Sequence, residues 1–214
     1  MTPDEERSGD RDPSDEESRM DEHIDVEIDR ETKSWAWVNE RPCPECGFDA
    51  SSTEAHEVPT ILRSNLDAWS GFLATDHGAD HHAADLDRLT ARPRPQTWSP
   101  LEYACHVRDV LELLAYRLER TLAEDHPEFE DWNPNDRAEL GRYGDERYPR
   151  AVLDAIAERS AHVIGLASSR TDAGWQRSGT RADGLVFTNA WLATYLTHDV
   201  VHHAHDVERI LGRA

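Results

Sequence analysis

Apolar residues recur at three- and four-residue steps in four separate stretches of the chain, each long enough for a helix. The second stretch has the clearest start, because Ser99 can cap the helix, Pro100 suits its first position and Glu102 completes a capping box. No convincing alternating pattern predicts strands between the stretches. The predicted helices are residues 59–74, 100–122, 150–168 and 188–211. The sequence therefore predicts an all-α fold, a bundle of four helices.

The segments between and before these helices are polar. Residues 76–95 combine histidines with a Pro-broken end, and residues 131–149 are rich in Asn, Asp, Pro and Gly, so both are predicted to be links with little regular structure. Residues 1–33 hold almost no large apolar side chains and are predicted to be an acidic disordered tail. The bundle domain is then expected to cover residues 34–214.

The charge of the chain limits the classes of molecule that it is expected to bind. The formal net charge is -21, and the first 31 residues alone carry 14 acidic side chains against 4 arginines. Without a Lys/Arg cluster, such a surface repels polyphosphates, so nucleic acid is not an expected partner. No run approaches the roughly 20 apolar residues that cross a membrane, and the N-terminus lacks the features of a secretion signal. We therefore expect a cytoplasmic protein with no membrane partner.

A pair of histidines on the last predicted helix has the spacing of metal ligands. His198 and His202 are four residues apart, which brings their imidazoles onto neighbouring turns of one face. A metal site with an open position needs a third donor from elsewhere. His106 is the best candidate, because it lies on the apolar stripe of the second predicted helix. Taken alone, the position of His106 favours a core histidine that bonds to a backbone carbonyl over a ligand.

The last predicted helix is apolar on two sides. Its aliphatic stripe lies roughly opposite His198 and His202, so amphipathicity alone would place these histidines outside the core. Their own face, however, carries Trp191 and Tyr195. One side could therefore line a cleft while the other packs on the bundle or on a second subunit, and we expect a homodimer. The stripe consists of Leu192, Leu196, Val200, Val207 and Leu211.

Two segments that carry these histidines, residues 98–110 and 198–207, resemble the DinB-like (YfiT-like) proteins, specifically the sub-group of mycothiol-producing bacteria. The likeness extends over roughly residues 35–211. It implies an up-down-down-up four-helix bundle that holds one divalent metal ion. The implied ligands are His106, His198 and His202. Zinc is the first expectation for the metal, with nickel or iron as alternatives.

The resemblance also implies a function. A metal-dependent enzyme of this kind would activate a low-molecular-weight thiol, such as mycothiol, or water for transfer to a small electrophile. One alternative is a non-catalytic metal- or small-molecule-binding stress protein that uses the same site. Another is a bundle whose histidines are structural and whose role is association through its last helix.

Neighbouring polar residues receive other roles in this interpretation. His203 lies about 140° around the helix from the first ligand of the pair and is left out of the metal site. His205 is also left out, because the proteins that this sequence resembles more often have an aromatic residue at that position. Asp109, Asp199 and Asp206 are candidates for orienting ligand imidazoles by accepting their second N–H.

Cys43 and Cys46 have the spacing of half a zinc knuckle, but a complete site needs two more ligands and the chain has no second cysteine pair. A redox pair is another interpretation, and an ordinary reduced turn is the simplest. Cys105, the third cysteine, is expected to be a small core residue, and no disulfide framework is expected. The histidines that could complete the knuckle are His56, His77, His81 and His82.

Overall fold

The computed structural model describes residues 35–74 and 79–212, and at 79–84 it describes the backbone alone. The predicted tail, residues 1–33, lies outside the described residues. The same holds for His77 and for the side chains of His81 and His82, three candidate partners of the cysteine pair.

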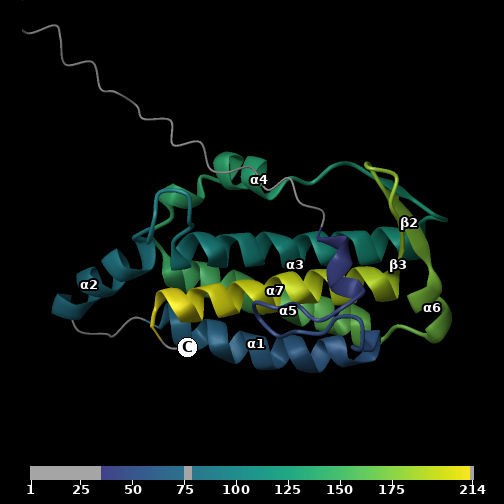
Figure 1. Cartoon of the computed structure of the whole chain (residues 1–214), viewed down its shortest axis with the longest axis horizontal. Coiled ribbons are helices and arrows are strands. Elements are labelled where there is room, and N and C mark those ends of the chain that lie inside the picture. The colour runs from purple at the N-terminus through teal and green to yellow at the C-terminus, as the bar shows by residue number, and fades with distance from the viewer. Residues whose placement is uncertain (1–34, 75–78, 213–214) are drawn as a thin grey trace, which may run out of the picture.

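Four long helices form the bundle, and their ends agree with the predicted ones to within one residue. They are α1 (Val58–Leu73), α3 (Pro100–Ala123), α5 (Pro149–Ser168) and α7 (Asn189–Ile210). Figure 1 shows that α1 and α7 run in one direction and α3 and α5 in the other. Helices α3 and α1 each pack against both α5 and α7. The expected up-down-down-up bundle is thereby confirmed.

Shorter elements cap the ends and sides of the bundle. They are the helices α2 (Ala79–Thr90), α4 (Pro134–Leu140) and α6 (Asp172–Gln176), the 3₁₀ turns η2 (Ala36–Asn39), η3 (Ala55–Glu57) and η4 (Tyr143–Asp145), and the strands β1 (Glu128–Phe129), β2 (Ser178–Arg181) and β3 (Val186–Thr188). The strands form one sheet in the order β1-β2-β3, with β1 parallel and β3 antiparallel to β2.

Two helices and the small sheet differ from the prediction. Helix α4 lies in residues 131–149, one of the predicted links, where the side chain of Asn133 caps its start. Helix α2 lies in a segment predicted to be a link, and its polar sequence is tied to the bundle by Leu89, which is fully buried. The small sheet was not predicted, because strands of two to four residues are too short to show alternation. Within the part of the chain described, no helix is both long and apolar enough to cross a membrane.

The core lies between the four long helices. His106 keeps only 2% of its surface exposed, and all but one residue of the apolar stripe of α3 are fully buried. The stripe consists of Val107, Val110, Leu111, Leu114, Leu118 and Leu122. The exception is Leu122, which is 49% exposed at the end of the helix. The start of α3 is fixed as predicted: Ser99 accepts a hydrogen bond from the Glu102 backbone N–H, while the Glu102 carboxylate accepts one from the Ser99 N–H. This cap sets the register of His106 two turns later.

Gly179 in β2 is expected to tolerate no side chain. A Cβ there would lie 2.7 Å from Cε2 of Phe129 and 3.0 Å from the carbonyl oxygen of Pro127. We expect Gly179→Ala to lower the free energy of unfolding by about 1–3 kcal/mol through overpacking. Gly165→Ala is the control, since nothing lies within 4 Å of its Cβ, and should be neutral or stabilising. Urea denaturation compares them, and equal stability of the two variants would contradict the prediction.

Candidate metal centre

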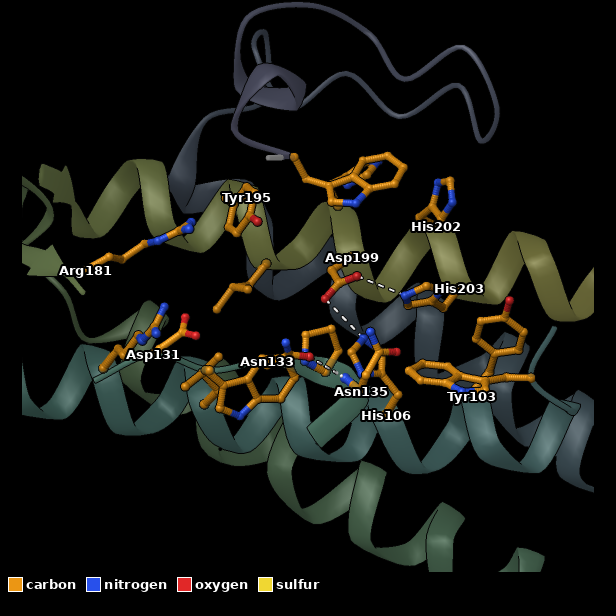
Figure 2. Close-up of a pocket in the computed structure, with 18 of the residues that line it drawn as sticks. Tyr103, His106, Asp131, Asn133, Asn135, Arg181, Tyr195, Asp199, His202 and His203 are labelled. Carbon is orange, nitrogen blue, oxygen red and sulfur yellow. Dashed lines mark hydrogen bonds and ion pairs between the residues drawn. The ribbon is translucent and has the colours of Figure 1, made fainter. Parts of the chain in front are cut away.

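Helix α7 presents two pairs of donor residues, each with a four-residue spacing. One pair is His198 and His202, and the other, displaced by one residue, is Asp199 and His203. A displacement of one residue turns the second pair by about 100° around the helix. In Figure 2, Asp199 and His203 point toward His106 on α3, whereas His202 points to the opposite side. The two pairs therefore face different neighbours, although all four residues line the same cavity.

The pair that faces α3 forms a compact group with His106. Asp199 lies between the two imidazoles: its Oδ2 is 3.4 Å from Nε2 of His106, and its Oδ1 is 3.0 Å from Nε2 of His203. One donor atom from each residue lies within 4.8 Å of the others. The group can therefore offer two imidazole nitrogens and a carboxylate oxygen to one ion.

The other pair meets the N-terminal segment. His198 and His202 form a group with Cys43 and Cys46, whose potential ligand atoms also lie within 4.8 Å of one another. The structure thus brings His198 and His202 together but places His106 with another pair. The three-histidine site stays a prediction. The distances favour grouping His106 with Asp199 and His203, and His198 and His202 with the two cysteines.

Asp206 orients the first group from behind. Its Oδ2 lies 3.0 Å from Nδ1 of His203, so this carboxylate accepts the Nδ1–H and leaves Nε2 directed at Asp199. A metal-bound histidine usually has such a partner on its second nitrogen. Asp206 is thus in position for the orienting role predicted for it, whereas the carboxylate of Asp199 lies among the potential donor atoms themselves.

Asp109 has a different role from the one predicted. Its carboxylate accepts a hydrogen bond from Tyr143 Oη at 2.7 Å and pairs with Arg108 at 2.8 Å, Arg159 at 3.2 Å and Arg137 at 3.3 Å. These partners come from α3, α4, α5 and η4. Asp109 therefore ties the bundle together instead of orienting an imidazole.

The charges of the first group are strongly coupled. Burial disfavours the charged form of His203, but its bonds to Asp199 and Asp206 outweigh this and raise its pKa to about 9. Burial works against ionised Asp199 as well, yet the two adjacent imidazoles hold its pKa well below the ordinary value. Burial lowers the pKa of His106, which keeps this imidazole neutral. A divalent ion here would take the place of the proton on His203.

A cavity of about 400 Å³ opens beside this group. One end is lined by His106, Asp199 and His203, with Tyr103 beside them, and Figure 2 shows Arg181 at the opposite end. The residues of the crossover between α3 and α5 form another wall, from Glu130 to Asn135. The group is therefore accessible to a small molecule.

Comparison with known proteins assigns the chain to a family. The sequence model of the DinB superfamily matches residues 72–205, which is more than half of the chain. The chain belongs to the DinB superfamily. No curated protein matches it significantly.

The fold also resembles the solved structure of YfiT from Bacillus subtilis, which is described as a probable metal-dependent hydrolase with an unusual four-helix bundle topology. The TM-score is 0.54 and the identity 20%, over 75% of this chain and 85% of that one. This likeness shows a shared fold. The family match of this DinB chain contains the first donor group entirely, while Cys43 and Cys46 precede it.

The sequence pattern placed Asp199 in an orienting role and left His203 out of the metal site, although a signal for both as donors was present. Asp199 and His203 repeat the four-residue ligand spacing of His198 and His202. By the turn of an ideal helix, His203 also lies only about 20° from Leu196 on the aliphatic stripe, which makes it the better candidate for an inward position. Asp199 and His203 are thus the pair nearer to the aliphatic stripe around the helix. They are also the pair that faces α3 in this DinB chain.

Proposed function

We propose that the protein is a metal-dependent enzyme of the DinB type whose ion is held by His106, Asp199 and His203. The observation that carries this proposal is the convergence of three donor atoms at one end of a cavity. The donor set suits zinc, since two histidines and one carboxylate leave an open position in a tetrahedral catalytic site. Nickel and iron are alternatives that the same donors accept.

When bound, a divalent ion here supplies Lewis acidity, which polarises a substrate group and lowers the pKa of an adjacent thiol or water. Asp199 contributes one negative charge, so the centre keeps a net positive charge that favours an anionic substrate group. Asp206 holds the His203 ring in position. We propose a low-molecular-weight thiol of the mycothiol kind as cosubstrate, with water as the alternative nucleophile, and the resemblance to the mycothiol sub-group supports this choice.

Other cavity residues can position the substrate. Burial raises the pKa of Tyr103, so its hydroxyl remains a hydrogen-bond donor beside His203. Nδ2 of Asn135 is buried and has no hydrogen-bond partner among the described residues, which leaves a donor for a ligand. At the far end, burial and the nearby Arg181 lower the pKa of Arg117 to about 10, so the Arg117 guanidinium remains charged at neutral pH. Arg117 and Arg181 both line this end of the cavity. They favour a substrate with a carboxylate or similar anionic group.

Activity assays of the zinc-loaded protein test this proposal. A thiol, mycothiol or cysteine, is offered with a chromogenic electrophile, and a chromogenic ester is offered without thiol. We expect zinc-dependent turnover in the thiol assay, lowered about 100-fold or more by Asp199→Asn, which corresponds to about 2.7 kcal/mol of the barrier. Asp154→Asn is the control, because Asp154 is exposed on α5, pairs with the exposed Arg150 and does not line the cavity.

The assays also separate the alternatives. Ester cleavage that needs zinc but no thiol would replace the transferase by a hydrolase, as the description of the Bacillus subtilis protein suggests for that protein. Ligand binding by the zinc-loaded protein without any turnover would support the non-catalytic binding protein and overturn the enzyme.

A further inference from the structure

The segment before α1 places two cysteines against the outer face of α7. Residues 43–47 form a tight turn, in which the Gly47 N–H donates to the Cys43 carbonyl at 2.9 Å and Gly47 adopts a φ of +74°. Cys43 is 1% exposed and Cys46 is half-buried. Two cysteines separated by two residues in such a turn are the usual first half of a structural zinc site.

The second half comes from α7. His198 and His202 are one turn apart, with ring centroids separated by 5.2 Å, and both are buried. Trp35 packs against both rings, at 6.1 Å and 5.5 Å between centroids, and Phe48 packs against that of His198 at 6.2 Å. Trp35 and Phe48 thus cover part of the two imidazoles, whose remaining side lines the cavity.

The distances suit a tetrahedral ion. Sγ of Cys43 lies 3.6 Å from Nδ1 of His202, within hydrogen-bonding distance for sulfur. Zinc bonds of about 2.3 Å to sulfur and about 2.0 Å to nitrogen, at a tetrahedral angle, place these two atoms about 3.5 Å apart. One potential ligand atom of each residue already lies within 4.8 Å of the other three, so little contraction is needed.

The hydrogen bonding supports the same conclusion. Nε2 of His198 is buried without a hydrogen-bond partner in the described part of the chain, which is costly for an imidazole nitrogen. The ring of His202, in contrast, turns Nδ1 to Cys43 and Nε2 to carboxylates, with Asp206 at 3.6 Å and Glu45 at 3.7 Å. Carboxylates behind the second nitrogen are typical of metal-bound histidines.

We propose that Cys43, Cys46, His198 and His202 form a second, closed zinc site that fastens the N-terminal segment to α7. Two thiolates balance the charge of the ion, and four protein ligands leave no open position, so the site is structural. Its location also matters for the cavity, because Trp35 on the fastened segment is one of the lining residues. The site is adjacent to the proposed catalytic centre, since His198 and His202 line the same cavity and Asp206 faces one histidine of each group.

Cobalt substitution of the full-length chain under reducing conditions tests this site. Cobalt bound by thiolates gives a near-ultraviolet charge-transfer band that nitrogen and oxygen ligands do not give. We expect two metal ions per chain and this band in the wild type, and one ion without the band in Cys43→Ser/Cys46→Ser. The control is Cys105→Ala, which removes a buried cysteine outside the group and should keep both ions and the band.

A second variant guards against misfolding of the first. His198→Ala/His202→Ala keeps both thiols and is expected to weaken cobalt binding at this site at least about 100-fold, more than the loss of an outer-sphere residue costs. Far-ultraviolet circular dichroism checks that each variant is folded. Absence of the band in the wild type, its persistence in the double cysteine variant, or a Cys43–Cys46 disulfide in the anaerobically purified protein would overturn the site.

Discussion

His203→Ala is expected to remove one metal ion per chain and to abolish metal-dependent activity. The substitution takes away an imidazole that lies 3.0 Å from Asp199 and is held from behind by Asp206. Loss of a direct ligand should lower the affinity of the centre for zinc more than about 100-fold, since outer residues alone cost 10- to 100-fold. Metal analysis after dialysis and competition with a chromogenic chelator measure the effect.

His205→Ala is the matched control on the same helix, because His205 belongs to neither donor group among the described residues. It should leave both the metal content and the activity unchanged. The prediction would be contradicted if His203→Ala kept the metal ion of the proposed catalytic centre and His202→Ala lost it. That pattern would restore the predicted set of His106, His198 and His202. The cobalt–thiolate band shows which ion has been lost.

Asp109→Ala is expected to destabilise the bundle by about 3–5 kcal/mol, the usual cost of removing one partner of a buried ion pair. Asp109 is 4% exposed, and its loss leaves Tyr143 and the guanidinium groups of Arg108, Arg137 and Arg159 without their common acceptor. For a chain of this size the midpoint of thermal unfolding should fall by roughly 10 °C. Urea and thermal denaturation measure both quantities.

The same residue predicts a pH dependence. Burial works against ionised Asp109, but its bonds to Arg108 and Tyr143 prevail and lower its pKa. A carboxyl group with a lower pKa in the folded state adds stability above its unfolded pKa of about 3.9, and this stability is lost as the pH falls through the folded value. Asp109→Asn should flatten the acid limb of the stability curve. An unchanged limb, or an Asp109→Ala variant within about 0.5 kcal/mol of the wild type, would contradict this role.

The helices were predictable because local signals and packing agree. The cap at Ser99 and the apolar stripe of α3 fix both its start and the inward direction of His106. The choice between the donor pairs of α7 was harder, since that helix is apolar on both sides and periodicity does not tell which side meets α3. The position of His203 beside Leu196 was the available evidence.

The partners of the cysteine pair could not be found from spacing. Cys43 and His202 are 159 residues apart in the chain, and they meet only because the segment before α1 folds across α7. Such a contact follows from tertiary packing, which leaves no periodic trace in the sequence. The cysteine turn itself was recognisable as half of a zinc site.

Because α3 and α5 run in the same direction, the substrate specificity of the protein can change during evolution through one segment. A chain that leaves one end of α3 must travel back along the bundle before α5 can begin, and Figure 1 shows this crossover passing over the side of the bundle through α4. The crossover supplies Asp131, Asn133 and Asn135 to the cavity, whereas every donor to the proposed centre lies on α3 or α7. Mutation, insertion or deletion in this one segment can therefore alter which molecules are accepted while the metal ligands stay in place.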